Sequence, residues 1–231
     1  MSSNPLIRPA AELLERLALP PENLALMNQA LRHRSAGGRH NERLEFLGDA
    51  ILNFVVAAEL YARRPDACEG ELSRLRALLV KEDSLARIAR ALHLGDYLQL
   101  GAGELKSGGF RRASILADAL EAVIGACYLH AGFEAAAVLI RNLFADALAH
   151  LPDAETLKDP KTRLQEYLQA RQRPLPVYEV SDISGAAHHQ TFTVLCRVEG
   201  IDTPGQGVGS SRRKAEQAAA QTLLERLLEK P

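Results

Sequence analysis

The hydrophobic periodicity of this chain changes abruptly after Pro152, and this change constrains the fold more than any other feature. Residues 1–150 repeat apolar side chains at helical spacing and are interrupted by proline and glycine pairs. We expect helices over residues 10–18, 22–32, 41–63, 70–80, 82–92, 112–131 and 133–149. The pattern predicts an all-α N-terminal domain over residues 1–150.

The remaining residues have a different pattern. Residues 151–157 are polar and flanked by prolines, which is typical of a linker. A helix over 159–171 is followed by three alternating stretches, 176–184, 190–200 and 201–209, and by a helix over 211–229. In the second stretch Phe192, Val194 and Cys196 share one face. The order predicts a small α+β (α-β-β-β-α) domain over 158–231, with a three-stranded antiparallel sheet and two helices on one of its faces.

Three carboxylates lie close together on the expected helix 41–63. Glu42, Glu45 and Asp49 fall within a sector of about 60° on a helical projection. The expected core stripe lies on the opposite side and consists of Leu44, Leu47, Ile51, Phe54 and Val55. Like charges at this spacing repel each other. On this helix alone, a solvated acidic face and a functional site both remain open.

A second acidic pair favours a metal site. Asp118 and Glu121 are spaced i, i+3 on the helix 112–131, and Ala122 and Gly125 fall on the same side, where small residues allow another backbone to approach. Oxygen ligands without His or Cys suit Mg²⁺ or Mn²⁺ rather than zinc. Two such ions support phosphodiester hydrolysis, provided that the two acidic helices meet.

Charge and cysteine usage set wider limits. The net charge of −1 does not indicate a polyanion partner, so any nucleic-acid site must be a local cluster. The three cysteines are far apart, which is typical of reduced thiols in a cytosolic protein. We find no secretory signal and no uninterrupted apolar run of membrane-spanning length. These features predict a cytoplasmic protein without a membrane partner.

Two long sequence blocks resemble a known family. HNERLEFLGDAIL, residues 40–52, is similar to the signature motif of bacterial ribonuclease III, and GELKSGGFRRASILADALEAVIGA, residues 103–126, is similar to its second conserved block. The α-β-β-β-α segment resembles the double-stranded-RNA-binding domain that follows the nuclease domain in this family. The resemblance extends from about residue 6 to residue 229.

The resemblance implies functional residues in the nuclease domain. The implied metal-binding and catalytic carboxylates are Glu45, Asp49, Asp118 and Glu121, with Glu42 and Glu69 at accessory acidic positions. Phe46 projects near the acidic face, and the matching aromatic side chain in the family fills a socket on a second subunit. This implies a homodimer. The alternative is that Phe46 belongs to the core.

The resemblance also implies an RNA-contacting surface. Its residues are Thr162, Gln165, Glu166, His188, Arg212, Arg213 and Lys214. Lys106 and Arg111, in the basic loop before the second acidic helix, would hold a phosphate near the metals. Two positions depart from the family pattern. Ala186 replaces a common proline, and Glu216 stands where the family often has lysine, which predicts a weaker cationic strip.

The implied activity is that of a Mg²⁺-dependent endoribonuclease, with Mn²⁺ as an alternative ion. It would hydrolyse double-stranded RNA by a metal-activated water and leave 5′-phosphate and 3′-hydroxyl ends, in the processing of ribosomal RNA precursors and messenger RNA. Two alternatives are a catalytically silent RNA-binding protein and a phosphatase for small esters. The Gly207-Val208-Gly209 stretch follows no parallel βαβ unit, so we expect no nucleotide cofactor.

Overall fold

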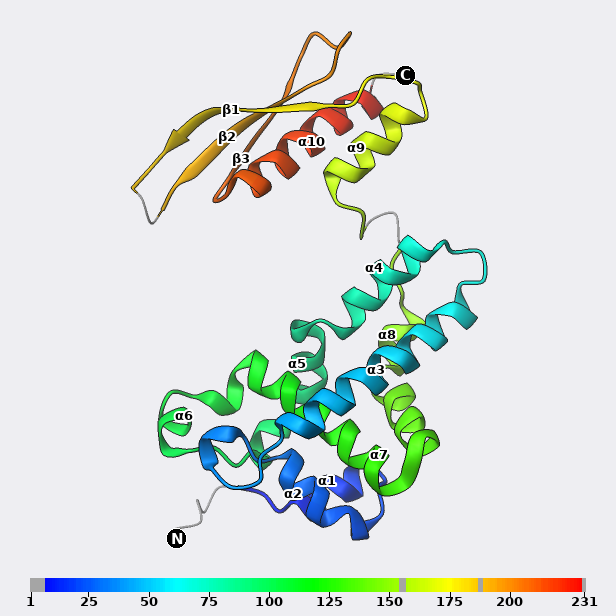
Figure 1. Cartoon of the computed structure of the whole chain (residues 1–231), viewed down its shortest axis with the longest axis vertical. Coiled ribbons are helices and arrows are strands. Elements are labelled where there is room, and N and C mark those ends of the chain that lie inside the picture. The colour runs from blue at the N-terminus through cyan, green and yellow to red at the C-terminus, as the bar shows by residue number, and fades with distance from the viewer. Residues whose placement is uncertain (1–6, 154–156, 187–188, 230–231) are drawn as a thin grey trace. The chain divides into compact units, whose positions relative to one another are not determined.

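A computed structural model describes residues 7–153, 157–186 and 189–229. The chain divides into two compact units, Met1–Ala154 and Glu155–Pro231, and each is described by itself (Figure 1). The family-implied RNA contact His188 lies outside the described residues.

The first unit is all-α, as the periodicity predicts. Its helices are α1 (Ala10–Arg16), α2 (Leu24–Ala30), α3 (Glu42–Arg63), α4 (Glu69–Val80), α5 (Glu82–Ala91), α6 (Ala102–Lys106), α7 (Ala113–Leu143) and α8 (Ala145–Ala149). Four short 3-10 turns lie between them, at Pro21–Asn23, Arg34–Ala36, Leu94–Tyr97 and Gly109–Arg111. The sequence did not predict α6. The expected helix 133–149 is divided between α7 and α8.

The buried helix α7 is the centre of this unit and packs against α2, α3 and α5. By length and composition it is apolar enough to cross a membrane, and it alone meets this test among the described residues. Half of that apolar window is nevertheless buried inside the unit. Gly132 interrupts the helix with a φ of 82°, a conformation that glycine adopts readily. These features are those of a core helix in a globular unit.

Helices α3 and α7 cross at two glycines. A Cβ added to Gly48 would meet the carbonyl oxygen of Glu121, and a Cβ added to Gly125 would meet the carbonyl oxygen of Leu44. The two backbones therefore touch where any larger residue would separate them. This confirms the prediction that the small residues beside the second acidic pair admit another backbone.

The expected core stripe of α3 is wrong at Phe54. Leu44, Ile51 and Val55 are buried, but Phe54 is 62% exposed. Its ring packs edge-on against Phe133 of α7, with ring centroids 5.6 Å apart. Gly48 lies against the backbone of α7 and Leu52 is fully buried, so the buried face of α3 is rotated away from Phe54.

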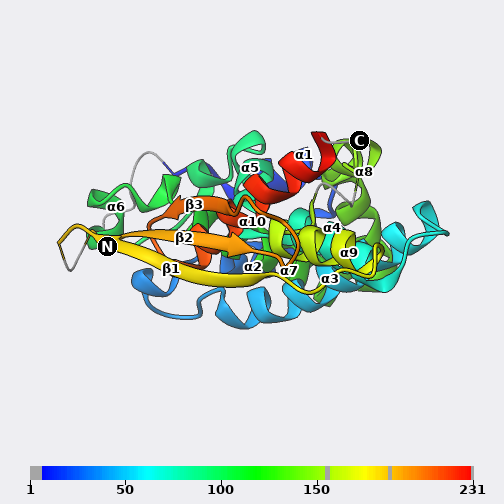
Figure 2. The same cartoon turned by 90° about the horizontal axis from the view of Figure 1, so that it is seen from above.

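The second unit has the predicted α-β-β-β-α order. Its elements are α9 (Pro160–Gln169), β1 (Val177–Ser184), β2 (Thr191–Arg197), β3 (Gly205–Gly209) and α10 (Arg212–Glu229). The sheet is antiparallel with the order β1-β2-β3, and both helices lie on one of its faces (Figures 1 and 2). Val194 and Cys196 are buried, which confirms the predicted inner face of β2.

The glycines of β3 bring this strand against α10. Added Cβ atoms on Gly205 and Gly207 would both meet backbone of Ala219. The strand is therefore glycine-rich because the helix lies directly on it, which also accounts for its weak strand signal. Gly207 and Gly209 allow the strand to pack closely against the backbone of α10.

We expect Gly48→Ala and Gly125→Ala each to destabilise the first unit, because the added methyl group would force the backbones of α3 and α7 apart. Overpacking of this kind costs about 1–3 kcal/mol or more, which corresponds to a fall of about 2 °C or more in melting temperature. Circular dichroism melting of the full chain measures this. The control is Gly103→Ala, whose Cβ would meet no atom within 4 Å. Equal melting temperatures for all three variants would contradict the close crossing.

Candidate functional site

The crossing of α3 and α7 brings carboxylates from both helices together. Glu45, Asp118 and Glu121 each place a carboxylate oxygen within 4.8 Å of the others. Glu45 lies one turn before Gly48 on α3, and Glu121 lies one turn before Gly125 on α7. The glycine crossing thus determines where the acidic side chains meet.

Burial and mutual repulsion disfavour the charged forms of these acids. Partial burial, followed by the charges of Asp49 and Glu45, raises the pKa of Glu121 to about 8. Burial and then the charge of Asp118 raise the pKa of Glu45. Burial and then the charge of Glu82 raise the pKa of Asp118. The cluster therefore lacks sufficient positive charge of its own, and the three half-buried oxygen donors fit a hard divalent cation.

The other predicted acids lie outside this group of three. Asp49 is exposed and its carboxylate accepts a hydrogen bond from Asn53 Nδ2 at 2.7 Å, although its charge still acts on Glu121. Glu42 pairs with Arg34 at 3.4 Å. Glu69 begins α4 and accepts a hydrogen bond from Ser73 Oγ at 2.7 Å. The structure brings together three of the six predicted acids.

A hollow of about 410 Å³ adjoins the acidic cluster. Its lining residues are His33, Arg34, Asn41, Glu42, Glu45, Glu104, Arg112, Ser114, Ile115 and Asp118. The hollow thus has carboxylates and cations in its wall, an arrangement that admits a phosphate beside a metal ion.

The cations of this hollow differ from those that the sequence indicated. Arg112 pairs with Glu104 at 2.9 Å and lines the hollow. Arg111 instead places its guanidinium over the ring of Phe110, 5.0 Å from its centroid. Lys106, at the end of α6, is exposed and does not line the hollow. Arg34 and Arg112 had no spacing signal in the sequence, because the turns that place them are short and irregular.

A second hollow, of about 660 Å³, lies between the N-terminal ends of α9 and α10. Its lining residues are Asp159, Lys161, Thr162, Gln165, Arg212, Arg213, Glu216 and Gln217. Four of the predicted RNA contacts are therefore neighbours here. Glu166 instead pairs with Lys158 at 2.7 Å, and Lys214 Nζ donates to Ser210 Oγ at 3.3 Å.

Asp159 fixes the start of α9 in this hollow. Its carboxylate caps the helix by accepting from the backbone N–H of Thr162 at 3.0 Å, and it also accepts from Gln217 Nε2 at 3.1 Å. Burial opposes ionisation, but these hydrogen bonds outweigh it and lower the pKa of Asp159. The cap therefore attaches α9 to α10 and holds Thr162 at the rim.

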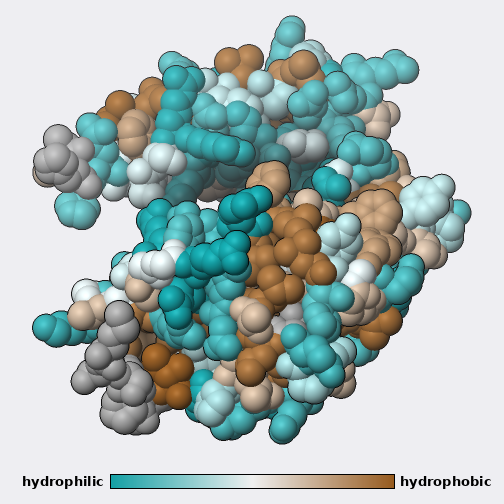
Figure 3. Space-filling model, turned by 60° about the horizontal axis from the view of Figure 1, so that its bottom comes forward, coloured by the Kyte–Doolittle hydropathy of each residue, from teal (hydrophilic) through white to brown (hydrophobic). Residues whose placement is uncertain are grey.

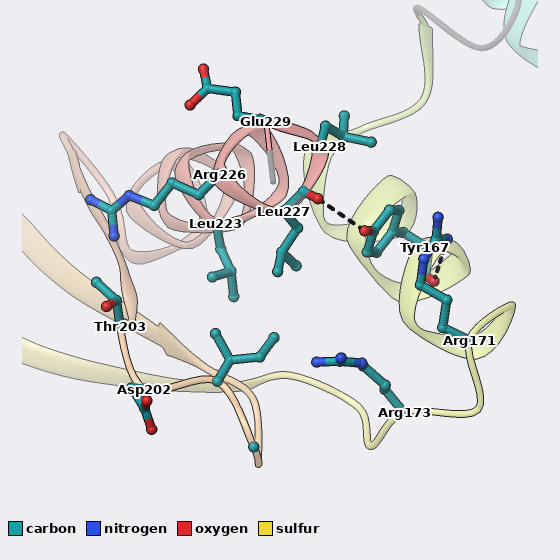
Figure 4. A pocket seen from close by; sticks show the side chains of 12 residues that line it. Tyr167, Arg171, Arg173, Asp202, Thr203, Leu223, Arg226, Leu227, Leu228 and Glu229 are labelled. Atoms are coloured by element: carbon teal, nitrogen blue, oxygen red, sulfur yellow. Dashed lines mark hydrogen bonds between the residues drawn. The ribbon is translucent and has the colours of Figure 1, made fainter. Parts of the chain in front are cut away.

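A larger cavity of the second unit, of about 930 Å³, lies at the C-terminal ends of the two helices (Figure 4). Its wall combines Tyr167, Ile201 and Leu227 with the guanidinium groups of Arg171 and Arg226. Among the described residues, no predicted RNA contact lines this cavity.

Comparisons with known proteins agree with this geometry. A Ribonuclease-III-like family model matches residues 23–148, and a double-stranded RNA binding motif matches residues 160–227. The chain belongs to the ribonuclease III family. The predicted family, the two-part fold and the assignment as an enzyme are confirmed.

Individual relatives cover nearly the whole chain. The chain is 57% identical to Ribonuclease 3 of Vibrio cholerae over 219 residues, which are 95% of this chain and 97% of that protein. It is 56% identical to Ribonuclease 3 of Alkalilimnicola ehrlichii, over 96% of this chain and 97% of that protein. A solved nuclease domain of ribonuclease III from Campylobacter jejuni is 44% identical with a TM-score of 0.57, and the match covers 58% of this chain and 95% of that one.

The raised pKa of Glu121 predicts a pH dependence of stability in the absence of divalent cations. The folded protein keeps this proton up to about pH 8, whereas an unfolded glutamate loses it near about pH 4.3. The stability that the proton confers is therefore complete below about pH 4.3 and is lost as the pH rises through about 8. We expect the melting temperature in EDTA to fall across this window.

Glu121→Gln should remove part of this fall, because the amide does not ionise. Circular dichroism melting between about pH 6 and about pH 9 measures it. Glu134→Gln, at an exposed position of the same helix, is the matched control. The assignment is wrong if Glu121→Gln and Glu134→Gln change with pH in the same way.

Proposed function

We propose that this protein is a Mg²⁺-dependent endoribonuclease that hydrolyses phosphodiester bonds in double-stranded RNA. The observation that carries the proposal is the carboxylate cluster of Glu45, Asp118 and Glu121 at the helix crossing. Family membership and the RNA-binding motif over residues 160–227 support the substrate class. The products would be 5′-phosphate and 3′-hydroxyl ends.

At the proposed site, acidic side chains would bind the cation and basic side chains would orient the phosphate. Glu45, Asp118 and Glu121 would hold the cation, with Asp49 beside them and Glu42 and Glu69 in accessory positions. A bound Mg²⁺ ion, or Mn²⁺ in its place, supplies activation of water and neutralisation of developing phosphate charge. Arg34 and Arg112, in the adjoining hollow, would orient the phosphate.

The second unit would hold the duplex. Arg212 and Arg213, beside the N-terminus of α10, would contact phosphates, where the helix dipole also favours anions. Thr162 and Gln165 would reach the minor groove and its 2′-hydroxyl groups. Glu166, His188 and Lys214 remain proposed contacts on the strength of the family resemblance. Lys106 remains a proposed contact because it lies in the basic segment before α7. Cytoplasmic processing of ribosomal RNA precursors and messenger RNA is the corresponding cellular role.

We also propose a homodimer of the nuclease unit. Phe46 is 79% exposed, which is contrary to a core position, and Phe54, Tyr61 and Val138 are at least 51% exposed. Figure 3 shows apolar side chains gathered on one face of this unit. Large apolar side chains without cover favour association, and the solved Campylobacter nuclease domain has a region involved in dimer formation.

Glu121→Ala should bind duplex RNA normally but cleave it at least about 100-fold more slowly. Loss of a residue that binds the metal directly should reduce activity more than loss of a residue that only hydrogen-bonds a metal ligand. The measurement is cleavage of a long RNA duplex with and without MgCl₂, alongside binding in EDTA. Glu134→Ala is the matched control on α7. Wild-type cleavage by Glu121→Ala would contradict the assignment. Lack of cleavage by the wild type, with intact binding, would favour the silent RNA-binding alternative.

Phe46→Glu should weaken the dimer. Burying one phenylalanine contributes about 1.5–3 kcal/mol, and a symmetrical dimer loses two, so the dissociation constant should rise at least about 100-fold. Sedimentation equilibrium measures the change. Val208→Glu, at a position 56% exposed in the RNA-binding unit, adds the same charge elsewhere. A monomeric wild type at micromolar concentration would refute the dimer.

A further inference from the structure

Glu216 is an acid in the middle of the proposed RNA-binding surface, and its contacts give it a definite role. Its side chain is 14% exposed, and its carboxylate accepts hydrogen bonds from Lys161 Nζ at 2.7 Å and from Arg212 Nε at 2.9 Å. The hydrogen bond from Lys161 outweighs the effect of burial and lowers the pKa of Glu216, with Arg212 acting in the same direction. The carboxylate is therefore charged at neutral pH and paired with two cations.

The hydrogen bond between Glu216 and Arg212 leaves the two terminal guanidinium nitrogens of Arg212 available to a ligand. Glu216 takes the Nε–H, and within the described residues no protein atom accepts from the two terminal nitrogens of Arg212. The Arg212 side chain is 66% exposed and lines the same hollow as Thr162 and Gln165. A guanidinium held through Nε presents its two remaining nitrogens as a rigid fork, which suits a phosphate.

Lys161 has a different role in the same group. Its ammonium lies 4.2 Å from the centroid of the Tyr178 ring, and its side chain is 34% exposed. Its backbone N–H donates to Gln217 Oε1 at 3.1 Å. Lys161 therefore joins α9 to α10 and to β1. The trio of Lys161, Glu216 and Arg212 carries a net charge of +1, the same as a single lysine.

We propose that Glu216 is a positioning residue that holds Arg212 in the orientation required to bind an RNA phosphate. This inference rests on the proposed binding of duplex RNA. It is the opposite of the expectation from the sequence, in which Glu216 only weakens the cationic strip. The two interpretations differ in sign, because a merely repulsive acid lowers affinity whereas a positioning acid raises it.

The test measures binding of the full chain to a short RNA duplex in EDTA, where cleavage does not occur, over a series of salt concentrations. We expect Glu216→Gln to weaken binding about tenfold and to reduce the slope of log affinity against log salt by about one, as for loss of one phosphate contact. Arg212→Ala should give the same loss. The double variant should bind no more weakly than Arg212→Ala alone, because Glu216 acts through Arg212.

Two further variants separate charge and fold from positioning. Glu225→Gln removes an equal charge from the same helix, at a carboxylate that pairs with Gln221, and should not weaken binding. Lys161→Met should lower the melting temperature but preserve the salt slope. If Glu216→Gln does not fold, Glu216→Asp replaces it: its charge is unchanged, so repulsion predicts no effect and positioning predicts weaker binding.

Each result has one meaning. Tighter binding by Glu216→Gln would overturn the inference in favour of repulsion. If Glu216→Gln weakened RNA binding equally in the wild-type and Arg212→Ala proteins, the inference would also be overturned, because the effect would not depend on the Arg212 side chain. Failure of the wild-type protein to bind duplex RNA would instead refute the proposed function.

Discussion

The contact between the backbones of α3 and α7 at Gly48 and Gly125 is the constraint on which the candidate active site depends. Each glycine faces a carbonyl oxygen of the other helix, so the two axes lie closer than side chains would otherwise permit. Glu45 and Glu121 lie one turn before these glycines, and they therefore share one region of space. Close packing, acid proximity and the raised pKa of Glu121 are successive consequences of one crossing.

Much of this site was predictable from local sequence, because a helical projection gives the direction of each side chain on its own helix. It placed Glu45 beside Asp49, Asp118 beside Glu121, and Gly125 beside the second pair. A projection does not show which neighbour covers each face. Phe54 was therefore assigned to the core, although the crossing leaves it exposed, and the separation of Asp49 from the closest carboxylates was not foreseen.

The cations were harder to predict because they depend on irregular backbone. The 3-10 turn Gly109–Arg111 directs Arg111 over Phe110 and leaves Arg112 in the hollow, a distinction that adjacent arginines do not reveal in sequence. Glu216 presents the same difficulty across a longer separation. Examined as a single position it is a missing lysine, but its partner Lys161 lies on another helix, and only the fold brings them together.

The two units manage buried negative charge in opposite ways, and this difference supports their proposed division of labour. In the second unit Glu216 is fully compensated by Lys161 and Arg212, so its charge orders its neighbours and its pKa is lowered. In the nuclease unit the carboxylates are close and under-compensated, so their pKa values are raised. A phosphate approaching that cluster meets repulsion until a divalent cation neutralises it. Under the proposed function, binding of RNA at the nuclease centre would therefore be coupled to binding of the cation, whereas binding at the second unit would need only its own cations.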